Sequence, residues 1–158
     1  MFGTLTREEI EDFLKKQFIG RIGCQIKNRI YVVPISYAYD GDCVYCHTQE
    51  GMKTKMMREN PKVCFEVDAL ETTATWKSII AWGRYVEVVD KDERAIALKV
   101  LLNRVHPFIS IKKMQLGEHW PFAPGNLNSI QEIVFKIQLK EKTGRFEVND
   151  ESLNNVMN

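Results

Sequence analysis

The sequence predicts a mainly β protein in which antiparallel strands form a barrel and helices lie at the periphery. Residues 18–26, 29–39 and 43–47 are rich in β-branched and aromatic side chains, and short turns containing Asn, Asp and Gly separate them. Successive strands joined by such turns are typical of an antiparallel meander or barrel. Residues 130–140 alternate apolar and polar side chains, as a strand with one buried face does.

These patterns predict six strands, at residues 18–26, 29–39, 43–47, 62–68, 76–89 and 130–140. Pro34 lies in the middle of the second strand and has no N–H to donate, so this strand is expected at a sheet edge or bulged there. A bulge would suit a flat ligand, whereas an edge proline would only discourage aggregation. The pair Asp40-Gly41 predicts a two-residue hairpin with positive φ angles, and Gly83 is expected to bend the fifth strand.

Helix starts are indicated at three places. Thr6 and Glu9 have capping-box spacing, and the helix that follows presents an apolar face formed by Ile10, Phe13 and Leu14. A second, short helix begins after Gly51 and ends before Pro61. A third is expected near 91–104, with one face formed by Ala95, Leu98, Leu102 and Val105.

Residues 106–128 have no regular pattern and contain several prolines, so they predict a loop with a short helix near residues 110–116. A loop of this length would either wall a substrate pocket or cover one end of the barrel. His106 and His119 are interpreted as structural. The chain is expected to form a single domain over residues 1–145, followed by a polar tail at residues 146–158.

Composition excludes several classes of function. The chain has 22 basic and 21 acidic residues in 158, and a formal net charge of +1 gives no field that would attract nucleic acid or an anionic membrane. No leader pattern and no long apolar run occur, so a cytoplasmic protein is expected.

The four cysteines are interpreted as buried, reduced side chains. Cys43 and Cys46 have the spacing of a redox motif, but residues three apart in a strand point to opposite faces. Cys24 and Cys64 also lie inside predicted strands, where cysteine behaves as a small apolar residue. We therefore expect no disulfide framework and no metal site.

A candidate anion site lies where the third strand turns into the short helix. It comprises His47, Thr48, the backbone amides near Gly51 and Met52, and the ammonium group of Lys53. Free N–H groups and the helix dipole both favour an anion at a helix start, and a lysine there repels the dipole unless an anion is bound. The site is interpreted as a phosphate site, the alternative being that Lys53 is simply solvated.

The segment PISYAYDGDCVYCHTQEGMKTKMMRENPKVCFEVD, residues 34–68, resembles the central motif of the FMN-binding split-barrel superfamily, the pyridoxamine 5′-phosphate oxidase-like proteins. Within it, the chain is most similar to the group related to nitroimidazole-resistance proteins. The likeness is densest over residues 18–68 and continues more weakly to about Gly144. It depends on the order of Pro34, Tyr37, His47-Thr48, Gly51, Lys53 and Asn60-Pro61.

This resemblance implies a six-stranded antiparallel split β-barrel that binds FMN as a homodimer, with the flavin between subunits. Lys53 would hold the phosphate, helped by the turn residues Cys46, His47 and Met52. Other implied flavin contacts are Val32, Val33, Pro34, Ile35 and Ser36 along the ring and ribityl chain, and Ser78 at a further position. The 106–128 segment of one subunit would face the flavin of the other.

The resemblance implies an NAD(P)H-dependent reductase of small acceptors such as nitroaromatics or quinones. Vitamin B6 oxidation is rejected, because oxidases of that kind have an arginine at Tyr31, a basic residue at Met52 and a substrate-binding C-terminal segment with Arg and Trp. No catalytic acid or base is identified. The alternatives are a flavin-binding or sensing module without turnover, and a relative that binds haem or deazaflavin.

Overall fold

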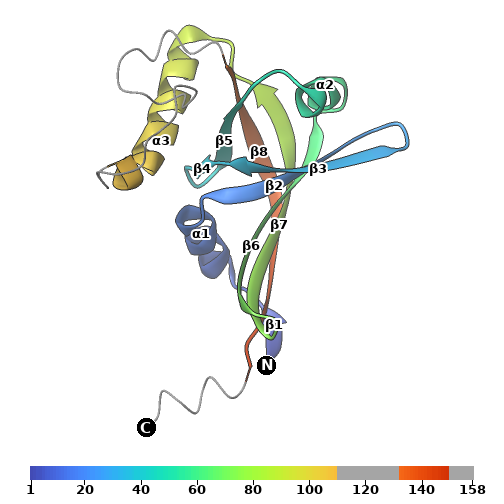
Figure 1. Ribbon diagram of the computed structural model, residues 1–158, viewed down its shortest axis with the longest axis vertical. Helices are drawn as coiled ribbons and strands as arrows, with labels where there is room; N and C mark the ends of the chain where they lie inside the picture. Colours follow the sequence, from blue (N-terminus) through green and yellow to red (C-terminus); the bar gives the residue numbers. More distant parts are fainter. Residues whose placement is uncertain (110–131, 150–158) are drawn as a thin grey trace.

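The computed structural model describes residues 1–109 and 132–149, and these form one curled antiparallel sheet with three helices around it (Figure 1). The elements are β1 (Phe2–Thr4), α1 (Arg7–Lys16), β2 (Ile19–Ile26), β3 (Arg29–Ser36), β4 (Ala38–Tyr39), β5 (Cys43–Thr48), α2 (Met52–Glu59), β6 (Lys62–Thr72), β7 (Thr75–Glu87), α3 (Lys91–Ile109) and β8 (Ile133–Glu147). The predicted mainly β architecture with peripheral helices is confirmed.

The strands run in the order β3-β2-β6-β7-β8-β5-β4, and β1 pairs with β8. The described part of the chain thus has eight strands rather than the six predicted, because β1 was missed and the expected strand 29–39 is divided at Tyr37. The two predicted hairpins are present, since β2 pairs with β3 and β4 pairs with β5, but they do not form one continuous meander, because β3 and β5 are not neighbours.

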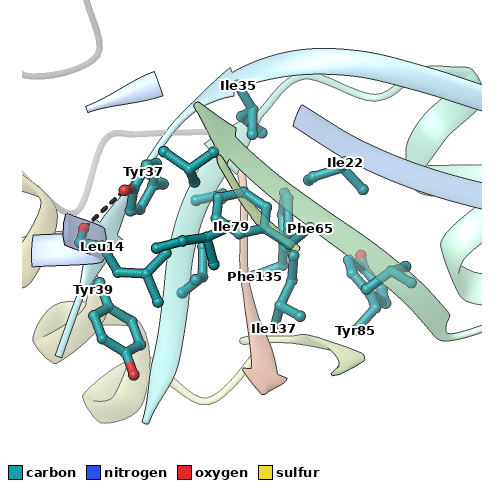
Figure 2. Close-up of a cluster of buried hydrophobic side chains, with 14 of the residues drawn as sticks. Leu14, Ile22, Ile35, Tyr37, Tyr39, Phe65, Ile79, Tyr85, Phe135 and Ile137 are labelled. Carbon is teal, nitrogen blue, oxygen red and sulfur yellow. Dashed lines mark hydrogen bonds between the residues drawn. The ribbon is translucent and has the colours of Figure 1, made fainter. Parts of the chain in front are cut away.

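The hydrogen bonds of Tyr37 account for the break between β3 and β4. Its backbone N–H bonds to the Phe18 carbonyl, and its hydroxyl donates to the Leu14 carbonyl at 2.7 Å, so the side chain is directed into the core beneath α1. Ile35 of β3 and Val44 of β5 nevertheless belong to one buried cluster, and the sheet therefore curls around this cluster (Figure 2).

Substituting Tyr37 by phenylalanine should lower the free energy of unfolding by about 1–2 kcal/mol, because the buried Leu14 carbonyl loses its side-chain donor. Urea denaturation of both proteins measures the difference. Tyr31→Phe is the matched control, since the Tyr31 hydroxyl makes no hydrogen bond to the described residues. Equal losses in the two variants would contradict the role of this bond.

Pro34 lies on an edge strand, as one of the two alternatives predicted, but its register with Arg21 is regular and no bulge occurs there. The turn after β4 also differs from the prediction: Gly41 alone has a positive φ, of 105°, and the Asp40 carboxylate accepts bonds from the N–H groups of Asp42 and Cys43. The predicted hairpin between β4 and β5 is therefore present, and the Asp40 side chain closes its turn. The bend at Gly83 is confirmed as a register shift between β7 and β8.

The N-terminal helix has the predicted capping box, and all three predicted apolar residues are buried. In α3 the buried positions are Ala97, Leu98 and Leu101, whereas Ala95 is exposed. The predicted face is thus confirmed at Leu98 and wrong at Ala95, because apolar side chains occur on all sides of this helix and their spacing alone does not select one side.

Helix α3 also continues through Pro107 to Ile109, past the predicted end near residue 104. The helix thus includes Pro107, although a proline beyond the first turn removes one backbone hydrogen bond and crowds the carbonyl four residues earlier. The predicted short helix near 110–116, the rest of the 106–128 loop and His119 lie outside the described residues.

All four cysteines are free, as predicted, and no described group of three or more His, Cys, Asp or Glu side chains has the geometry to hold a metal ion. Among the helices described, none combines the length and apolar character needed to span a membrane. Strand β8 extends to Glu147 and so includes the first two residues of the predicted polar tail.

Candidate functional site

The start of α2 is open to an anion. The chain leaves β5 at Thr48 and enters α2 at Met52, and Gly51 at the N-cap supplies no side chain to the first backbone amides. The first turn carries no acidic residue. These N–H groups and the positive end of the helix dipole are therefore available to a negatively charged group.

Lys53 is half-buried in that first turn, and within residues 1–109 and 132–149 its ammonium group makes no hydrogen bond or ion pair. Burial raises the pKa of the Cys24 and Cys46 thiols, and the positive charge of Lys53 partly opposes this rise in both. The ammonium group is therefore near Cys24 of β2 and Cys46 of β5. Lys55, by contrast, is exposed and fits the simpler interpretation of a solvated lysine.

His47 has a partner that the sequence did not indicate. Its Nδ1 atom lies 2.5 Å from a carboxylate oxygen of Glu132, and both side chains are half-buried. Arg94 of α3 donates to the Glu132 carbonyl at 2.6 Å, which links the end of β5 to α3 and to the start of β8. No local pattern could reveal Glu132, because 85 positions separate it from His47.

The other predicted residues of this turn differ in exposure. Cys46 is fully buried, so its side chain faces the core. The Thr48 hydroxyl donates to the Gln49 carbonyl at 3.2 Å, and Met52 is exposed beside Lys53. The structure thus brings His47, Thr48, Met52 and Lys53 to one turn but directs Cys46 away from solvent.

The predicted residues of β3 alternate between two faces. Val32, Pro34 and Ser36 are exposed, whereas Ile35 is buried and Val33 half-buried. Within the described chain β3 pairs only with β2, so the backbone groups along its outer edge have no strand partner. An edge of this kind offers donors and acceptors to a flat polar ligand.

Ser78 does not join these residues within one chain. It lies on β7, separated from β3 by β2 and β6, and its hydroxyl donates to Glu66 at 3.2 Å. Glu66 and Asp68 both accept hydrogen bonds from Arg21, at 2.8 and 2.5 Å. The side chains of Arg21, Glu66, Asp68 and Ser78 form a polar cluster on the face of the sheet opposite the buried core, which we call the open face.

Beside this cluster the open face is apolar. One row of paired residues crosses four neighbouring strands, in the order Val32, Gly23, Cys64 and Trp82. Together with Ile30 and Ile80, this row lines a groove of about 550 Å³. Val32 is 59% and Trp82 42% exposed. An exposed apolar groove of this kind is typical of a binding or assembly surface.

A curled antiparallel sheet with an open helix start and an apolar outer face is the architecture of a split-barrel protein. The chain belongs to the pyridoxamine 5′-phosphate oxidase family, because the model of that family matches residues 6–145. The resemblance inferred from residues 34–68 is thereby confirmed.

Three relatives illustrate the likeness. The protein RA0666 of Rhizobium meliloti (strain 1021) is 28% identical over 149 residues, covering 89% of this chain and 92% of that protein. The crystal structure of an FAD-binding protein from Mesorhizobium loti is 27% identical with a TM-score of 0.74, covering 94% of this chain and 99% of that one. A structure from Bacteroides thetaiotaomicron, described as a candidate 5-nitroimidazole antibiotic resistance protein, is 19% identical with a TM-score of 0.69, covering 92% and 87%. At this lower identity the third comparison shows the fold.

Proposed function

We propose that this protein binds a flavin, FMN, as a homodimer and acts as an NAD(P)H-dependent reductase of small acceptors such as nitroaromatics or quinones. The observation that carries the proposal is Lys53, a half-buried cation at an open helix start with no ion-pair partner among the described residues. A phosphate would pair with the ammonium group and accept bonds from the first amides of α2.

Three features support flavin as the phosphate-bearing ligand. The similar protein from Mesorhizobium loti binds FAD, by its description. The outer edge of β3 offers backbone groups to a polar ring edge, and the exposed Val32 and Pro34 offer apolar contact to its face. A bound flavin would supply hydride transfer, whereas this chain would orient it and exclude water.

The open sheet face supports a homodimer. A second copy placed on the groove would cover Val32, Ile80 and Trp82, which are exposed in one chain. Ser78 would then serve the flavin of the partner subunit, because it is remote from β3 of its own. An aromatic side chain at the centre of an apolar patch is typical of interface residues that contribute most to affinity.

The visible spectrum of the purified protein, with the released cofactor identified by mass, tests this proposal. An FMN mass supports it, an FAD mass corrects the cofactor, and a haem or deazaflavin spectrum overturns it. Anaerobic NAD(P)H oxidation with a nitroaromatic or quinone acceptor then separates a reductase from a flavin-binding module without turnover.

Lys53→Ala should weaken FMN binding by about 10- to 100-fold, because one charge-assisted bond to a phosphate is lost, and should leave riboflavin binding unchanged. Quenching of flavin fluorescence on titration measures both affinities. Lys55→Ala is the matched control, since this neighbouring lysine is exposed. FMN affinity that is equal in Lys53→Ala and wild type would contradict the phosphate site.

A further inference from the structure

A carboxylate lies beside the proposed phosphate site. Glu50 immediately precedes Gly51, the N-cap of α2, and half of its side chain is exposed. Left free, this carboxylate would repel a phosphate at the helix start. It would also be able to accept bonds from the same helix amides and from Lys53, as an internal competitor for the anion.

Arg58 keeps the Glu50 carboxylate from these interactions. Its Nη1 atom donates to both oxygens of Glu50, at 2.9 and 2.8 Å, from the last turn of the same helix. The Thr54 hydroxyl contacts Glu50 at 2.9 Å as well. The hydrogen bond from Arg58 is the main cause of a lowered pKa of Glu50, so the carboxylate stays ionised while it is held along the flank of α2.

The guanidinium group has a second anchor. Its Nε and Nη2 atoms donate to the two oxygens of Glu87 on β7, at 2.7 and 2.9 Å, and the Tyr85 hydroxyl donates to the same carboxylate at 3.0 Å. Four hydrogen bonds to two carboxylates therefore fix the direction of the Arg58 side chain.

We infer that Arg58 is a positioning residue for the phosphate group of the ligand: it acts through Glu50, which it neutralises and holds away from the amides of α2. The inference rests on the proposed function, since it concerns the affinity of the same site. It differs from a purely structural role, in which Arg58 would only join α2 to β7 through Glu87.

Arg58→Gln should weaken FMN binding by about 5- to 10-fold, the size expected from one released carboxylate near a phosphate, without changing riboflavin binding. Adding Glu50→Gln to that variant should restore FMN affinity to within about twofold of Glu50→Gln alone. The affinities are measured by flavin fluorescence, and circular dichroism checks the fold. Arg58→Lys, which keeps the charge, should show a smaller loss and the same rescue, so the test holds if Arg58→Gln does not fold.

Glu87→Gln separates the two roles of Arg58, because it removes the second anchor and leaves Glu50 paired. FMN affinity within about twofold of wild type is the expected result. An equal loss in Glu87→Gln and Arg58→Gln, a parallel loss of riboflavin affinity, or no rescue by Glu50→Gln would each overturn the inference. Wild-type protein that binds neither flavin would instead overturn the proposed function itself.

Discussion

Replacing Trp82 by glutamate should leave the subunit folded, weaken the proposed homodimer by more than about 100-fold and thereby remove flavin binding. Trp82 lies on the open sheet face in the same row as Val32, so its side chain contributes little to the core of one chain. In a dimer formed through this face, the glutamate would bury a charge without a partner, which costs several kcal/mol. Sedimentation analysis and flavin titration measure the two effects.

Val89→Glu is the matched control for that experiment. Val89 follows β7, is 81% exposed and does not line the groove, so the same charge should not affect assembly there. A Trp82→Glu protein that sediments as the wild-type dimer would show that the sheet face is not the interface. A wild-type monomer that binds flavin would remove the homodimer from the proposal and retain the flavin.

Replacing Phe65 by alanine should lower the free energy of unfolding by about 3–5 kcal/mol, which is the range for removing a fully buried aromatic side chain. Phe65 has no exposed surface, and its ring meets that of Tyr37 edge-on with centroids 5.1 Å apart. A Cβ atom at Gly20 would lie 2.4 Å from Cζ of Phe65, so the ring packs directly against the backbone of β2. Alanine at this position therefore leaves a cavity between Tyr37 and the backbone of β2.

Chemical denaturation measures this loss, and Phe2→Ala is the control because Phe2 is 62% exposed. A loss below about 1 kcal/mol for Phe65→Ala would contradict the packing, since such a value is typical of a surface substitution. The same experiment with FMN added would indicate whether ligand binding to the folded state offsets the cavity.

Local signals in the sequence were sufficient to predict most elements of this fold. The capping box of Thr6 and Glu9, the start of the helix expected near residue 91 and the bend at Gly83 each depend on residues a few positions apart, and each is present in the structure. The pairing of β5 with β8 was not predictable in this way. Its residues are far apart in the sequence, and alternating apolar side chains show that a strand is half-buried without showing its neighbours.

In the candidate site, too, some features follow from neighbouring residues and others from residues far apart in the sequence. The start of α2 and Lys53 were recognisable in the sequence because the residues that mark a helix start, and a cation placed there against the helix dipole, are only a few positions apart. The hydrogen bond of His47 with Glu132 and the separation of Ser78 from β3 both depend on how distant strands are arranged, and no short pattern contains that information. The hydrogen bonds of Arg58 to Glu50 and Glu87 likewise join α2 to a strand residue 29 positions away.

The last described strand has a consequence for how this protein is made. Strand β8 is the neighbour of β7 and β5 and also pairs with β1, so residues 133–147 contact both the first strand and the middle of the chain. While the ribosome is still synthesising the residues before 133, β5 and β7 each lack one of the strands beside which they lie in the finished sheet. The barrel therefore closes after most of the chain has left the ribosome, and until then these strand edges are the part of the nascent protein that chaperones would need to cover.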